Sequence, residues 1–148
     1  MPRPWPVASR DSDFDPYLAG MPEASVQMFR RFVDMARTPG LVTFELQNGP
    51  IVLRGSRRIF ASVRVLDKGL RGHLNLMRRV NDPRLGKVEA FTKSLIYHGY
   101  LVASISDLDE EFQRWLDEAH SVGDGAHLLS QPESVPSPER DSNARPTA

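Results

Sequence analysis

Two neighbouring runs of alternating residues, separated by a short turn sequence, restrict this chain to folds that contain an antiparallel hairpin. The first run covers residues 58–66 and the second covers residues 70–77, with Asp67-Lys68-Gly69 between them. Successive side chains of a strand point to opposite faces, so each run sorts its residues into two sets. The sequence therefore predicts a hairpin with one buried face and one face directed to water.

The two predicted faces of this hairpin differ in chemistry. The buried set is small or aliphatic and consists of Ile59, Ala61, Val63, Val65, Leu70, Gly72, Leu74 and Leu76. The outward set mixes apolar and polar residues and consists of Phe60, Ser62, Arg64, Leu66, Arg71, His73, Asn75 and Met77. If the two runs pair as predicted, Arg64 lies near Arg71 or His73 across the hairpin.

Other segments also have strand character. Residues 41–47 and 51–53 flank Asn48-Gly49-Pro50, a strong turn signal, and residues 94–105 are rich in aromatic and β-branched side chains. Residues 84–91 follow the turn sequence Asn81-Asp82-Pro83 and are predicted to form a short helix. The chain thus has four or five predicted strands.

An amphipathic helix is predicted on each side of the strands. Between residues 22 and 37, apolar side chains recur at the spacing of one helix face, with Pro22 in the first turn and Pro39-Gly40 as the stop. The second helix starts near Ser106-Asp107-Leu108-Asp109, a variant of the capping box, and ends at Gly123. The acidic residues around this start are explained by the helix dipole rather than by cation binding.

These elements predict a two-layer α+β domain, with two amphipathic helices packed on one face of a mostly antiparallel, four- to five-stranded sheet. The domain is expected to span residues 21–123. Residues 1–20 and 124–148 are rich in Pro, Ser and charged residues and bury too little apolar surface to offset the entropy of ordering. Both are predicted to be disordered.

Composition excludes several kinds of chemistry. The 148 residues contain no cysteine, so disulfides, thiolate metal sites and cysteine nucleophiles are excluded. The chain lacks P-loop, G-x-G-x-x-G and G-x-S-x-G motifs, and neither His73 nor His98 has a carboxylate at a metal-ligand spacing. No catalytic residue, metal or cofactor is predicted, and a non-catalytic role is favoured.

The expected location is cytoplasmic and away from membranes. The first residues, Met1-Pro2-Arg3-Pro4-Trp5-Pro6, contain no apolar run of the kind that a secretory signal needs. No segment approaches the run of about 20 apolar residues that spans a bilayer.

Charge is distributed unevenly along the chain. The 19 basic and 19 acidic residues cancel overall, yet residues 50–93 hold eleven Arg or Lys and three Asp or Glu. The middle is therefore basic and the flanks are acidic, an asymmetry that bears on partners rather than on fold.

The basic middle supplies a candidate anion-binding or nucleic-acid-binding surface. Its residues are Arg58, Arg64, Arg71 and His73 on the outward hairpin face, and Arg78, Arg79, Arg84 and Lys87 around the turn at residues 81–83. Guanidinium groups suit phosphate and carboxylate ligands. A solvated face that prevents aggregation explains the same residues, and the sequence favours that simpler interpretation.

Histidines offer a second candidate. His73 and His98 would form a polar site, either a metal-binding or a proton-transfer pair, if their strands were neighbours and both side chains shared a face. Local hydrogen bonding is the simpler explanation for each of them. His120, near the end of the second helix, is interpreted as a partner of the helix dipole.

The order of several segments resembles an uncharacterised bacterial family, of actinobacterial type, with a domain of unknown function. The matching pieces are residues 21–32, 58–63, 82–89, Tyr97-His98 and residues 106–116, which end in the Trp115-Leu116 pair. The resemblance covers roughly residues 20–122. It implies a fold and no activity, because it brings no catalytic residues that could be transferred to this chain.

Three functional hypotheses follow. The first is a non-catalytic binding module for a protein or an acidic ligand, with self-association into a homodimer left open. The second is nucleic-acid or anion binding through the basic hairpin face. The third is a small-ligand binder or small enzyme that uses His73 and His98.

Overall fold

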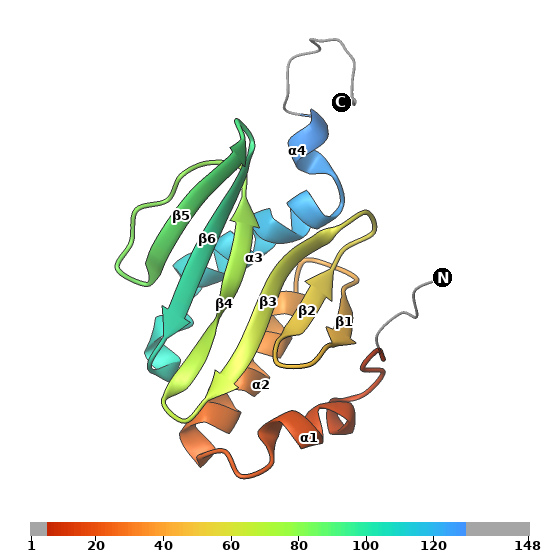
Figure 1. Cartoon of the computed structure of the whole chain (residues 1–148), viewed down its shortest axis with the longest axis vertical. Coiled ribbons are helices and arrows are strands. Elements are labelled where there is room, and N and C mark those ends of the chain that lie inside the picture. The colour runs from red at the N-terminus through yellow and green to blue at the C-terminus, as the bar shows by residue number, and fades with distance from the viewer. Residues whose placement is uncertain (1–5, 130–148) are drawn as a thin grey trace.

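The computed structural model describes residues 6–129, which form one antiparallel six-stranded sheet with helices packed against it (Figure 1). The strand order is β1-β2-β3-β4-β6-β5. The strands are β1 (Thr43–Leu46), β2 (Ile51–Arg54), β3 (Ile59–Leu66), β4 (Gly69–Leu76), β5 (Leu85–Thr92) and β6 (Leu95–Val102). The predicted α+β class and antiparallel sheet are confirmed.

Two long helices cover one face of this sheet. They are α2 (Glu23–Arg37) and α3 (Glu110–Gly123), and both pack against β3 and β4. Their aromatic side chains Phe29, Phe32, Phe112 and Trp115 are at most 1% exposed and fill the space between the layers. The shorter helical segments are a 3-10 turn at Asp11–Phe14, α1 (Asp15–Leu18), a 3-10 turn at Ile105–Asp107 and α4 (Ala126–Leu129).

The central hairpin of β3 and β4 forms as its alternating pattern predicts. Val63 pairs with Gly72 and Val65 with Leu70 on the helix-covered face, while Arg64 pairs with Arg71 on the other face. Gly69 closes the turn with a positive φ, and the carbonyl of Val102 lies where a side chain at this position would project. Only glycine fits there without strain.

Phe60 is the exception to the predicted alternation. Leu53 pairs with Ala61 and Arg54 pairs with Ile59, so Phe60 is the extra residue of a β-bulge. A bulge rotates the local side chains, and the Phe60 ring packs edge-on against His120 of α3 with a centroid distance of 5.5 Å. The prediction that Phe60 faces outward is therefore wrong.

The predicted short helix at residues 84–91 is also wrong, because this segment is the edge strand β5. It pairs along its length with β6, and this pairing raises the strand count from the predicted four or five to six. Only its first residue, Leu85, is buried. Main-chain hydrogen bonding to β6, rather than a buried apolar face, holds the segment in strand conformation.

Structure extends beyond the predicted domain limits of residues 21 and 123. Phe14 is 1% exposed, and its ring meets the rings of Phe29 and Phe44 edge-on at 5.1 and 5.4 Å. The prediction of disorder is therefore wrong for residues 11–18, and α4 lies within the predicted C-terminal tail. Residues 1–5 and 130–148, to which the same prediction applies, lie outside the described residues.

The start of α3 is capped by Asp109, three residues beyond the predicted Ser106. The Asp109 carboxylate accepts a hydrogen bond of 3.0 Å from the Phe112 backbone N–H. Asp107 instead accepts from the backbone N–H groups of Ala103 and Ser104 and closes the preceding 3-10 turn.

None of the helices within residues 6–129 combines the length and apolar character needed to cross a bilayer.

Candidate nucleic-acid interface on the outer sheet face

The sheet face opposite α2 and α3, which we call the outer face, carries exposed polar, charged and aromatic side chains. Strand register fixes its membership, because residues paired across two strands share a face. Its central members are Ser62, Arg64, Arg71, His73, Lys87, Glu89, Tyr97 and Leu101.

Two exposed arginines lie directly opposite each other on this face. Arg64 of β3 pairs with Arg71 of β4, and both side chains are exposed. Like charges opposite each other in a sheet are destabilising. Neither arginine has an ion pair among the described residues. The pair forms the cationic part of the candidate interface.

The Arg64 guanidinium extends toward the β1–β2 turn. It lies over Gly49 so closely that a side chain at that position would overlap it. At this point a hollow of about 480 Å³ opens between Arg64, Tyr17, Met21 and Asp67. An oxyanion that bound Arg64 would have room in this hollow.

Aromatic rings lie next to the arginine pair. The His73 and Tyr97 rings stack at a centroid distance of 4.9 Å with an interplanar angle of 8°, and Phe91 meets Tyr97 edge-on at 6.3 Å. Phe91 is 57% exposed, and Leu101, which pairs with Arg71, is 53% exposed. The outer face therefore combines two free guanidinium groups with exposed apolar and aromatic surface.

His73 is neutral at physiological pH. Burial lowers its pKa from the usual 6.5 to about 4. Its Nδ1 lies 2.7 Å from Ser62 Oγ, a spacing also found in pairs of a nucleophile and a general base. A base with so low a pKa abstracts protons poorly near neutral pH, so His73 is poorly suited to activate Ser62 as a general base.

Asn75 is a buried polar residue on the same face of the sheet. It pairs with Tyr97 across β4 and β6 and is 4% exposed. Its Nδ2 donates a hydrogen bond of 3.3 Å to the carbonyl of Ile59, whereas Oδ1 has no partner among the described residues.

The structure separates three of the other predicted basic residues, Arg58, Arg78 and Arg79, from this face. The Arg58 guanidinium lies 3.4 Å from His127 Nε2 of α4, and burial lowers its pKa. Arg78 pairs at 3.1 Å with Glu118 of α3, on the helical side. Arg79 is exposed in the loop that follows β4. Arg58, Arg78 and Arg79 therefore do not form one site with Arg64, Arg71 and His73, which stay together on the outer face.

Arg84 and Lys87, from the second predicted basic set, have different environments. The Arg84 side chain is 15% exposed and pairs with the carboxylates of Asp82 and Asp109, which makes it unavailable to a ligand. Lys87 of β5 is exposed and pairs with Gly99 on the outer face. Lys87 adds a third cation to the interface.

His73 and His98 lie on opposite faces of the sheet, so the predicted shared site does not form. His98 pairs with Leu74 on the helix-covered face, is fully buried, and accepts a hydrogen bond of 3.0 Å from the Val80 N–H. Its pKa is lowered, chiefly by burial. Within residues 6–129, no group of three or more His, Asp or Glu side chains could hold a metal ion.

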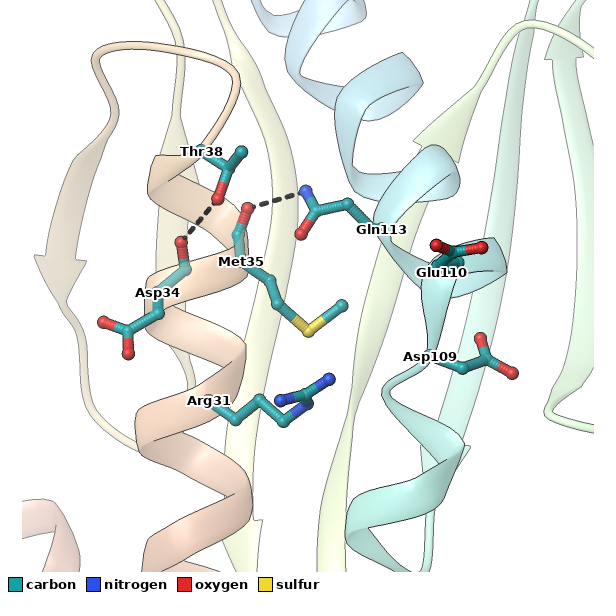
Figure 2. A pocket seen from close by; sticks show the side chains of 7 residues that line it. All are labelled: Arg31, Asp34, Met35, Thr38, Asp109, Glu110 and Gln113. Atoms are coloured by element: carbon teal, nitrogen blue, oxygen red, sulfur yellow. Dashed lines mark hydrogen bonds between the residues drawn. The ribbon is translucent and has the colours of Figure 1, made fainter.

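A second hollow of about 500 Å³ lies between α2 and α3 (Figure 2). Its polar groups join the two helices. The Gln113 amide donates to the Met35 carbonyl at 2.9 Å, and Arg31 Nε donates to the Leu108 carbonyl at 3.0 Å. Asp34 and Glu110 give its rim negative charge, so it is unsuited to phosphate.

Comparison of the chain with models of protein families, with curated proteins and with solved structures gave no match. The bacterial family resemblance drawn from the sequence therefore remains a prediction.

Sequence reasoning does not place three contributors on this face. Lys87 is among the predicted basic residues, but both Lys87 and Phe91 belong to the segment predicted as a helix, and Tyr97 belongs to the predicted strand 94–105 with no face assigned to it. Alternation along β6 could have predicted the position of Tyr97. Tyr97 and Gly99 share one face of the sheet, and His98 and Tyr100 share the other.

Proposed function

We propose that this protein is a non-catalytic binding module whose outer sheet face binds single-stranded nucleic acid. The observation that carries the proposal is the pairing of exposed Arg64 with exposed Arg71 beside the His73–Tyr97 stack. Guanidinium groups bind phosphate oxygens, and aromatic rings stack with unpaired bases.

A single strand fits this face better than a duplex for a geometric reason. The bases of a duplex are stacked on one another, so ring contacts on a flat protein surface are unavailable to them. Sheet proteins that bind single strands present aromatic side chains on an open face, with helices on the other side. The arrangement of α2 and α3 behind β3 and β4 has this form.

Reversing the charge of both arginines tests the cationic part of the proposal. We expect Arg64→Glu/Arg71→Glu to weaken binding of a fluorescent single-stranded oligonucleotide by about 100-fold at low salt, because two phosphate contacts become repulsive. Fluorescence anisotropy with DNA and RNA oligonucleotides measures this. With three cations on the face, log K for the unaltered protein should fall against log[salt] with a slope of about −2.

The matched control is Arg30→Glu/Arg114→Glu, which makes the same change in net charge on the exposed surfaces of α2 and α3. It should bind within about threefold of the unaltered protein at moderate salt, where distant charges are screened. Equal losses in both double variants would reduce the effect to net charge and contradict a defined interface. Absence of binding to any oligonucleotide at low salt would refute the proposal itself.

The aromatic part has its own test. We expect Tyr97→Leu to weaken single-strand binding by about tenfold, because a stacked base contributes roughly 1–3 kcal/mol. Tyr97→Phe keeps the ring and should retain the affinity. Parallel titrations with a duplex of the same sequence separate stacking from charge, and an equal loss for duplex and single strand would argue against base stacking on Tyr97.

A further inference from the structure

The two edges of the sheet are protected very differently. At the β1 edge, residues 6–8 form additional backbone hydrogen bonds: Leu46 N–H donates to the Pro6 carbonyl at 2.7 Å, and Ala8 N–H donates to the Phe44 carbonyl at 3.0 Å. The other edge is β5, which pairs only with β6 in the described part of the chain. Open edge strands readily add another strand.

The β5 edge is long and accessible. It has eight residues, twice the length of β1, and six of them are exposed, including Ala90 and Phe91. Figure 1 shows β5 at the border of the sheet, with β6 on one side and only the loop that connects β4 to β5 on the other. An edge of this kind favours association unless charges prevent it.

The charged residues of β5 can form complementary pairs with those of a second β5 strand. Lys87 and Glu89 flank Val88, and both belong to the outer face. If a second β5 pairs antiparallel with Val88 opposite the second Val88, each Lys87 lies opposite a Glu89 of the other copy. Centring the pairing on Glu89 or on Lys87 instead places like charges opposite each other, which is unfavourable.

We propose that β5 is a dimerisation edge at which two copies of this chain pair antiparallel about Val88. The two-fold axis of such a pair is perpendicular to the sheet, so both outer faces lie on the same side of one continuous twelve-stranded sheet. The dimer does not depend on nucleic-acid binding. If dimerisation and nucleic-acid binding both occur, the cationic and aromatic surfaces of the two copies form one longer binding surface.

Charge exchange tests this register. Sedimentation velocity at concentrations up to about 1 mM covers weak association. The unaltered protein should dimerise, and Lys87→Glu and Glu89→Lys should each weaken the dimer by about tenfold, because both cross-strand pairs become repulsive. The exchange variant Lys87→Glu/Glu89→Lys should restore the dimer, because the opposite charges face each other again. Both residues are exposed, and circular dichroism checks that each variant is folded.

A crosslink provides an independent measurement, because the chain has no cysteine of its own. Val88→Cys should form an intermolecular disulfide under mild oxidation, whereas Leu41→Cys, at a loop position that is 94% exposed, should not. A monomer at every concentration, or an exchange variant that stays monomeric, would overturn the proposal.

The dimer proposal and the nucleic-acid proposal can be refuted independently of each other. Glu89→Lys is expected to weaken the dimer and to strengthen oligonucleotide binding, because it adds positive charge to the outer face. Loss of oligonucleotide binding in Arg64→Glu/Arg71→Glu should leave the sedimentation of the protein unchanged.

Discussion

Replacement of Arg84 by methionine is expected to lower the free energy of unfolding by about 2–4 kcal/mol, since it leaves the Asp82 carboxylate, which is only 16% exposed, without its charged partner. Arg84 Nε lies 2.9 Å from Asp82, and its terminal nitrogens lie 2.9 Å from Asp109 and 3.5 Å from Glu111. Its guanidinium also lies over the Trp115 ring, 4.6 Å from the centroid. These contacts join the start of β5 to the start of α3.

Urea unfolding at neutral pH measures this loss, and two variants calibrate it. Arg84→Lys keeps the charge but loses the planar fork, so its stability should lie between those of the unaltered protein and the methionine variant. Arg30→Met removes an exposed pair with Asp15, separated by 4.0 Å, and should change stability by less than about 1 kcal/mol. Equal effects of Arg84→Met and Arg30→Met would contradict the structural role of Arg84.

The Arg84 effect should also depend on pH. Hydrogen bonding to Arg84 lowers the pKa of Asp82, and the Phe112 N–H together with Arg84 lowers the pKa of Asp109. A carboxylate with a lowered pKa in the folded state stabilises the protein above its unfolded pKa of about 3.8, and this contribution is lost as pH falls through the folded pKa. The difference between Arg84→Met and the unaltered protein should therefore shrink in acid below pH 4.

Acidification from pH 7 to pH 5 is expected to destabilise the folded chain by about 2–4 kcal/mol through its buried histidines. Burial lowers the pKa of His73 to about 4, and burial with the neighbouring Arg58 and Arg57 lowers that of His127 to about 4. In the unfolded chain both titrate near 6.5. Between these values the unfolded state binds more protons, so the free energy of unfolding falls as pH decreases.

Urea unfolding at several pH values between 4 and 7 tests this expectation. His73→Phe keeps a ring against Tyr97 and removes one titrating group, so it should reduce the slope of stability against pH between 4.5 and 6 by up to about 1.4 kcal/mol per pH unit. His127→Asn tests the other histidine in the same way. An unchanged slope in both variants would show that other groups control the acid response.

How far the sequence predicts the candidate site depends on how local each signal is. The shared face of Arg64, Arg71 and His73 follows from alternation in two adjacent runs and a short turn, and the strand register agrees. The contribution of Tyr97, Phe91 and Lys87 depends on β6 lying between β4 and β5. The strand order depends on contacts between residues far apart in the chain, and no short segment of the sequence predicts it.

The segment 84–91 shows why one element was mispredicted. Leu85, Val88 and Phe91 recur every three residues, which is closer to a helix period than to the alternation of a strand. As an edge strand exposed along most of its length, β5 has no buried face that would impose alternation. Its conformation comes from backbone hydrogen bonds to β6.

The sequence by itself determined the elements whose residues sort onto one buried face: the helix at residues 22–37, the central hairpin and the final amphipathic helix. Their apolar periodicity is local, and burying apolar surface is the dominant favourable term in folding. Tertiary structure alone decided the bulge that turns Phe60 inward, the opposite faces of His73 and His98, and the three carboxylates around Arg84. These features depend on contacts between residues far apart in the chain, which residue spacing does not encode.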